Sequence, residues 1–208
     1  MIKIILLVVF SAACASVAFT QSPDYQKFEI YGGYSHNHET KGHEGFDGFN
    51  ASLTRNISRY VGLKFDVAGH FGKQAFFEFL GNRAYVTASV FNFLGGVQIK
   101  NNSTDSRFKP FGHALIGIAH ARNKISLPTR DLGFLDELLD FCSPDPGIQN
   151  CPSGGTDTGF AGVFGGGLDI RINRRFDLRA IQADYNPTWL FGSRQQNFRL
   201  GAGIVIHK

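Results

Sequence analysis

The chain has 208 residues, of which 25 are Gly and 21 are Phe, 18% are charged, and the formal net charge is +4. This length excludes a peptide and a large multidomain enzyme, and charge usage lies below the average of about 25% for soluble domains. A composition rich in Gly and aromatic residues favours strands and tight turns over long amphipathic helices. The net charge is small and evenly spread along the chain, so we expect no nucleic-acid partner.

The first 18 residues predict a secretory signal peptide. Lys3 gives a positive start, Ile4–Phe10 an apolar core, and Ser16-Val17-Ala18 a cleavage site with small residues at both required positions. The apolar run is shorter than the roughly 20 residues of a membrane-spanning helix. A lipoprotein signal ending at Cys14 is the alternative, but the branched aliphatic residue expected three positions earlier is Ser11. We expect residues 1–18 to be removed and residues 19–208 to form one domain.

Beyond this segment, apolar and polar residues alternate with a period of two, as in strands with one apolar and one polar face. In the seventh segment the parity of the charged residues changes between Asp177 and Asp184, which predicts a β-bulge near Ala180 and Ile181. Eight segments carry the alternation: 26–36, 46–56, 60–71, 86–100, 108–121, 158–172, 176–186 and 195–207.

The connections between these segments alternate in length. Short polar turns are expected at 56–60, 101–107 and 173–175. The longer connections are 36–46, 72–85, 122–157 and 186–194. All the long connections therefore lie at one end of an up-and-down meander. The predicted fold class is all-β, an eight-stranded antiparallel up-and-down transmembrane β-barrel.

The longest connection carries its own signals. Leucines at 132, 135, 138 and 139 interleave with acidic residues and indicate a short amphipathic helix or turn. Cys142 and Cys151 follow and predict a disulfide, because an even number of Cys remains after signal cleavage in an oxidising compartment. Zinc is the less favoured alternative, since no His lies within ten residues of either Cys. The connection is either a recognition surface or a disulfide-pinned cap without a ligand.

A membrane barrel and a soluble, lipocalin-like barrel differ in which face of the strands lines the interior. Charged residues share their face with glycines such as Gly33 and Gly203, which leave room for long side chains in a narrow lumen. Aromatic residues gather near the strand ends, as in interfacial girdles. We therefore predict that the polar face is inside. The predicted interior ionic network consists of Lys64, Asp66, Lys100, Asp169, Arg171, Asp177, Arg179 and Arg199.

Four stretches of the chain resemble a known family. They are residues 28–35 (FEIYGGYS), 110–115 (PFGHAL), 164–171 (FGGGLDIR) and 197–204 (NFRLGAGI). These stretches are similar to the small eight-stranded outer-membrane barrels of the OmpA-like and OmpX-like type, over residues 27–206. The resemblance implies a bacterial outer-membrane location, outer-membrane lipids and the barrel assembly machinery as partners, and residues 19–208 as the barrel domain.

Histidines near the loop end raise the question of catalysis. His36, His38 and His43 lie close together in the sequence, with Ser35 beside His36 and Glu39 after His38. Nucleophilic catalysis needs a Ser, a base and an orienting carboxylate in one place. No strand carries such a signature at its outer end, so we expect no catalytic site, no metal and no cofactor.

The expected function is a non-enzymatic outer-membrane barrel with a plugged polar interior. A barrel of eight strands is just wide enough for side chains to fill it, so no free passage of solutes is expected. Its role would be structural, or exercised through its surface loops on a ligand that the sequence does not name. The alternatives are a lipid-modifying barrel enzyme and a soluble lipocalin-like barrel that binds an apolar ligand.

Overall fold

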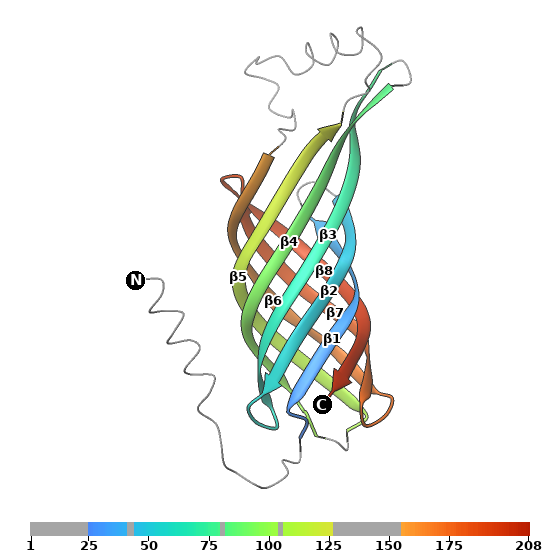
Figure 1. The fold of residues 1–208 in the computed structure, drawn as a ribbon, viewed down its shortest axis with the longest axis vertical. Helices are drawn as coiled ribbons and strands as arrows, with labels where there is room; N and C mark the ends of the chain where they lie inside the picture. Colours follow the sequence, from blue (N-terminus) through green and yellow to red (C-terminus); the bar gives the residue numbers. More distant parts are fainter. Residues whose placement is uncertain (1–24, 41–43, 80–81, 104–105, 127–154) are drawn as a thin grey trace, which may run out of the picture.

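The computed structural model describes residues 25–40, 44–79, 82–103, 106–126 and 155–208, which form one closed barrel (Figure 1). Eight antiparallel strands follow one another in chain order, and β8 pairs with β1 to close the barrel. The predicted eight-stranded up-and-down barrel is confirmed. Among the described residues, no helix is long and apolar enough to cross a membrane. The strands are β1 (Phe28–Glu39), β2 (Glu44–Asn56), β3 (Val61–Phe79), β4 (Asn82–Lys100), β5 (Phe108–Ser126), β6 (Gly155–Arg171), β7 (Phe176–Leu190) and β8 (Ser193–His207).

The strands extend further at the loop end than the alternation predicted. Residues 72–85 were expected to be a long loop, but residues 72–79 and 82–85 extend β3 and β4 as paired strands, and this hairpin rises above the rest of the barrel in Figure 1. Phe and Tyr there keep a high strand propensity although the strict alternation stops. The predicted loop 186–194 is also wrong. Strands β7 and β8 are joined at Phe191 and Gly192, whose φ angles of 52° and 70° are those of a tight two-residue hairpin turn.

The predicted β-bulge in β7 is confirmed. Pairing of β7 with β8 jumps from Arg179↔Gly203 to Gln182↔Gly201, and its pairing with β6 shifts at the same place. The bulge shifts the side-chain alternation of the strand by one residue. Arg179 before it and Gln182 after it are therefore both buried inside the barrel.

The apolar face of the strands is outside and the polar face is inside. On β3 the Phe65 side chain is 52% exposed, whereas the adjacent Asp66 is 0% exposed. The outward apolar positions of β3 run from Val61 to Phe71. At about 3.3 Å per residue and a tilt of about 45°, this stretch is about 23 Å high, close to the roughly 25 Å apolar band of outer-membrane barrels.

Aromatic side chains border this band at both ends. Near the short turns lie the exposed rings of Phe28, Tyr60, Phe108 and Phe176. Near the loop end lie the exposed rings of Tyr34, Phe49, Phe71, Phe160, Trp189 and Phe198. Such rings sit at the level of lipid headgroups in membrane proteins. The outer surface is therefore built in the way that a bilayer requires.

In the folded barrel, several exposed basic side chains lie together at the turn end. Along the sequence these residues are spread out. Arg59 and Arg107 place their guanidinium groups 5.7 and 6.0 Å from the ring centroids of Tyr60 and Phe108. The carboxylates described near this end face the lumen and are buried. We call the exposed basic side chains here the basic collar: Lys27, Arg55, Arg59, Arg107, Arg174, Arg175 and Lys208.

Candidate functional site: the barrel interior

The lower half of the lumen is filled by a buried ion-paired chain. Lys100 Nζ lies 2.9 Å from Glu29 Oε2 and 2.8 Å from Asp169 Oδ2. Arg179 donates to both oxygens of Asp169, with Nε 2.8 Å from Oδ1 and Nη2 3.1 Å from Oδ2. This two-pronged contact fixes the guanidinium plane, which a single Lys ammonium would not do.

The chain continues upward through Gln182 to a second cation. Arg179 Nη1 donates to Gln182 Oε1 at 2.8 Å, and Gln182 Nε2 donates to Asp184 Oδ2 at 2.6 Å. Arg199 donates to the same Asp184 oxygen from Nε and Nη2, at 2.9 and 2.7 Å. Its Nη1 reaches Asp66 Oδ1 at 3.1 Å. One connected set of contacts therefore runs from Glu29 to Asp66 across the lumen.

Aromatic rings and a histidine complete the packing around these charges. The Arg179 guanidinium lies 4.2 Å from the ring centroid of Tyr31 and 4.1 Å from that of Phe111, as in cation–π contacts. Lys64 Nζ is 3.3 Å from His113 Nδ1 and 5.7 Å from the Phe111 ring centroid. His113 in turn places Nε2 2.9 Å from an oxygen of Asp184.

A separate group lies at the turn end of the lumen. Asp177 Oδ2 is 3.0 Å from Lys109 Nζ and 2.7 Å from His207 Nε2. Arg171, the last residue of β6, pairs with Asp177 in the strand register and is half-buried there. Of the eight residues predicted for the network, seven are buried in the lumen and Arg171 lies at its rim.

The buried charges of the described interior balance. All eight strands contribute, and Asn50 of β2 joins through a 2.9 Å hydrogen bond to Asp66. The network predicted from the sequence did not include Glu29, Lys109 or Asp184. Lys109 was missed because the alternation of apolar and polar residues is blurred around Pro110. Asp184 could have been assigned to the lumen from the change of parity that marks the bulge in β7. The buried cations are Lys64, Lys100, Lys109, Arg179 and Arg199, and the buried carboxylates are Glu29, Asp66, Asp169, Asp177 and Asp184.

Ser35 and His36, the neighbours that were considered for catalysis, lie on opposite faces of β1. Ser35 faces the lumen, whereas its neighbour His36 faces outward. Ser35 Oγ instead lies 2.9 Å from Nε2 of the buried His70. The other ring nitrogen of His70 has no hydrogen-bond partner among the described residues, so no carboxylate orients the ring. The Ser–His pair therefore lacks the third group of a triad.

The other histidines near the loop end lie on the outer surface or outside the described residues. His36 Nδ1 is 2.7 Å from Asp47 Oδ1 on the outer face, and Asp47 pairs in the strand register with Phe71 of the loop-end aromatic ring. The Tyr34 hydroxyl also donates a hydrogen bond to Asp47 Oδ1. His120 contacts Thr158 at 2.7 Å. Across the described part of the chain, no group of three His, Cys, Asp or Glu side chains is placed to hold a metal ion. His43 lies outside the described residues, as do the leucine-rich stretch and the predicted disulfide of Cys142 and Cys151.

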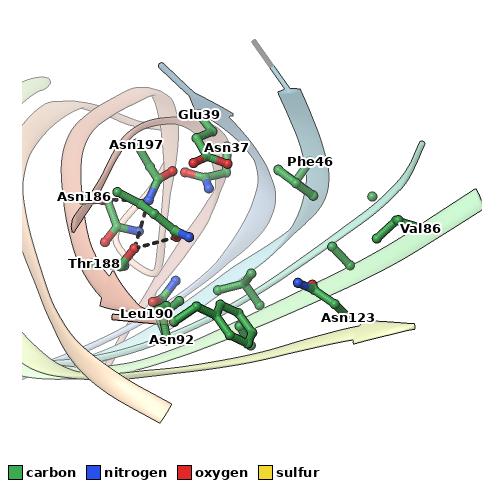
Figure 2. Close-up of a pocket in the computed structure, with 16 residues that line it drawn as sticks. Asn37, Glu39, Phe46, Val86, Asn92, Asn123, Asn186, Thr188, Leu190 and Asn197 are labelled. Atoms are coloured by element: carbon green, nitrogen blue, oxygen red, sulfur yellow. Dashed lines mark hydrogen bonds between the residues drawn. The ribbon is translucent and has the colours of Figure 1, made fainter. Parts of the chain in front are cut away.

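Above the ion-paired chain, the lumen contains a cavity of about 320 Å³ (Figure 2). We call this cavity the vestibule. It is lined at the loop end by side chains from the inner faces of β1, β4, β5, β7 and β8, with Phe46 from β2. Apolar side chains of the lumen, including Leu94, Leu115 and Leu190, form one packed cluster next to it. This cavity was not predicted from the sequence.

Comparisons with known proteins identify the fold. No protein-family model and no curated protein sequence matches the chain. Ail of Yersinia pestis, solved with the heparin analogue sucrose octasulfate, matches with a TM-score of 0.52 and 15% identity over 87% of this chain and 99% of that one. Neisserial surface protein A matches with a TM-score of 0.51 and 13% identity, over 88% of this chain and 97% of that one.

A third match extends the likeness to another genus. The outer-membrane protein OprG of Pseudomonas aeruginosa has a TM-score of 0.51 and 13% identity, covering 89% of this chain and 97% of that one. Identities this low carry information on fold alone. The chain therefore has the fold of the small, OmpA-like, eight-stranded barrels found in bacterial outer membranes.

Proposed function

We propose that the chain is a non-enzymatic integral protein of the bacterial outer membrane. In this proposal the interior of the barrel is a closed plug, and the role is structural or exercised at the loop end. The single observation that carries the proposal is the pairing of an apolar, aromatic-bordered exterior with a charge-balanced interior. The soluble lipocalin-like alternative needs the opposite arrangement, with the apolar face inside.

The plug is supported by the continuity of its contacts. A solute crossing the lumen would have to separate Arg179 from Asp169 or Arg199 from Asp184, each held by two hydrogen bonds. Breaking a buried ion pair while one partner stays buried costs about 3 to 5 kcal/mol. Passage through an intact lumen is therefore not expected.

The basic collar supports an orientation of the barrel with its short turns on the periplasmic side of the membrane. Basic side chains close to an anionic bilayer surface each contribute about 1 kcal/mol of attraction. The collar lies just beyond the aromatic ring at the turn end, where it meets the headgroups of the adjacent leaflet. We place the short turns on the periplasmic side and the long β3–β4 hairpin on the cell surface.

Two measurements test the proposal. The refolded protein should migrate differently on a gel before and after boiling, with a strand-dominated far-ultraviolet spectrum in detergent. Reconstituted into a planar bilayer, it should give no steady conductance. A chain that is soluble without detergent would contradict the membrane location, and a stable open channel would contradict the plug.

Enzyme activity is the second candidate, favoured by the hydrogen bond between Ser35 and His70. Both side chains are buried in the lumen and do not face the lipid that such an enzyme would modify. Incubation of the reconstituted protein with lipid A should therefore leave its acyl chains unchanged. If the wild-type protein removes or transfers acyl chains and a folded Ser35→Ala variant does not, the protein is an acyltransferase or deacylase and the non-enzymatic proposal is wrong.

A loop-end ligand is the remaining part of the proposal. The structure of Ail was solved with sucrose octasulfate, a heparin analogue. In this chain Lys73, Arg122, Lys124 and Arg194 are exposed at the loop end and offer positive charge to a sulfated ligand. Retention on a heparin column that decreases when Arg122 and Lys124 are changed to Ser would support this partner class, whereas unchanged retention would exclude these residues.

A further inference from the structure

The vestibule has a lining that does not resemble the plug below it. The plug is built from ion pairs, whereas Glu39 is the only ionisable residue among the sixteen described residues that line the vestibule. Its volume of about 320 Å³ lies at the lower end of the range for small-molecule sites, about 300 to 1,000 Å³. The cavity is therefore of a size and polarity suited to a small uncharged molecule.

One side of the vestibule is a group of amide and hydroxyl side chains. Figure 2 shows Asn37, Asn186, Thr188 and Asn197 gathered on this side. Asn197 Nδ2 donates to the Asn186 main-chain oxygen at 3.1 Å and to Thr188 Oγ1 at 3.2 Å. The Thr188 hydroxyl also donates to Gln195 Oε1 at 3.2 Å. These bonds hold Thr188, Gln195 and Asn197 in place independently of any ligand.

Several amides of the lining are buried without a partner among the described residues. Asn186 has neither its side-chain oxygen nor its nitrogen hydrogen-bonded, and it is 1% exposed. The side-chain oxygens of Asn37 and Asn92 are also buried and unpartnered. Leaving a buried polar group unsatisfied costs about 1 to 3 kcal/mol. The lining therefore presents at least one donor and three acceptors whose hydrogen bonds a ligand would complete.

The opposite side of the vestibule, on β4 and β5, is mostly apolar, with Asn92 and Asn123 as its described polar side chains. Val86, Ala88 and Val90 of β4 and Ala121 of β5 line it, and Phe46 adds an aromatic ring. A ligand that fits must place CH groups against these side chains while its polar edge meets the amides. Hydroxyl groups both donate and accept, so they match the mixed demand of Asn186.

We propose that the vestibule binds a neutral, polyhydroxylated small molecule, that is, a sugar of one or two rings. An anionic ligand is disfavoured because no cationic side chain among the described residues lines the cavity, and burying an ion without a partner is unfavourable. A cationic ligand is disfavoured because Glu39, the one described carboxylate of the lining, already takes part in another interaction. A purely apolar ligand is disfavoured because it would leave the Asn186, Asn37 and Asn92 side chains unsatisfied. This proposal concerns the lumen and does not depend on the location of the barrel.

The test uses the full refolded chain in a detergent without a sugar headgroup. Titration with glucose, galactose, maltose and lactose is followed by calorimetry and by the side-chain NH₂ signals of ¹⁵N-labelled Asn. We expect at least one neutral sugar to bind and to shift the Asn186 signal, and its 6-phosphate or carboxylate analogue to bind at least tenfold more weakly. No binding by any of these sugars to a barrel that shows the heat-dependent gel shift would overturn the proposal.

Variants separate the vestibule from nonspecific contact. Asn186→Leu should weaken binding at least tenfold, and Ala88→Phe, which fills the apolar side without removing a polar group, should do the same. Gln196→Leu is the matched control, because Gln196 is an exposed amide on the outer face at the same end of β8. Binding that survives both vestibule variants, or that falls equally in the control, would place the sugar elsewhere.

Discussion

The lipid-facing position of Phe65 gives the sharpest test of the membrane assignment. Phe65 lies close to the middle of the outward apolar stretch from Val61 to Phe71 on β3 and is 52% exposed. Arg at the bilayer midplane of such a barrel costs about 2 to 4 kcal/mol, and this falls to about 0 to 1 near the interface. Phe65→Arg should therefore lower the folding equilibrium constant about 30- to 700-fold.

Phe71→Arg is the matched control for this substitution. Phe71 is on the same strand, also points outward and is 49% exposed. Six residues at about 3.3 Å each and a tilt of about 45° separate the two side chains by about 14 Å along the bilayer normal. Phe71 therefore lies in the loop-end aromatic ring, where Arg reaches the headgroups, and its replacement should cost no more than about 1 kcal/mol.

Urea titration of both variants refolded into lipid vesicles measures these free energies. Trp189 is the single Trp of the chain and lies on the outer face at the loop end, so its fluorescence reports departure from the lipid. Equal costs for the two Arg variants, or a cost below about 1 kcal/mol for Phe65→Arg, would refute the conclusion that β3 crosses a bilayer at this depth.

Three further predictions follow from the interior and from the turn end. Arg199→Ala leaves the buried carboxylates of Asp66 and Asp184 without this cation. The substitution should lower the free energy of unfolding by about 3 to 5 kcal/mol in the same urea assay. A loss under about 1 kcal/mol would show that the plug does not depend on Arg199. Gly33→Ala should destabilise the barrel by about 1 to 3 kcal/mol, because its Cβ would lie 2.2 Å from the Ala202 carbonyl oxygen, whereas a Cβ at Gly32 meets nothing within 4 Å. Equal effects of Ala at these two positions would contradict the described register of β1 and β8. Replacing Arg174 and Arg175 by Ser should narrow the difference in folding yield between vesicles with and without anionic phospholipid, and an unchanged difference would argue against the basic collar as a membrane contact.

Much of the fold was predictable because strand alternation is a local property. Neighbours such as Phe65 and Asp66 carry opposite preferences for lipid and lumen, so their order in the chain indicates both the strand and its faces. The bulge in β7 was also visible, because the charged residues on either side of Ala180 change parity. The ends of the strands were less predictable, because a strand that continues beyond the apolar band no longer needs one face for lipid and one for the lumen. The alternation that marks a strand then disappears while the pairing continues.

Sequence by itself determined the strand number, the up-and-down order and the residue types that a narrow lumen holds. Only the tertiary structure decided which charges meet. Arg199 reaches Asp66, which is 133 residues away in the chain, because closure of β8 onto β1 brings opposite walls of the barrel within the length of two side chains. The same closure gathers Asn37, Asn92 and Asn186 around the vestibule and collects basic residues from separate turns into one collar. Partners across a closed barrel are set by strand tilt and register, which no local pattern of residues encodes.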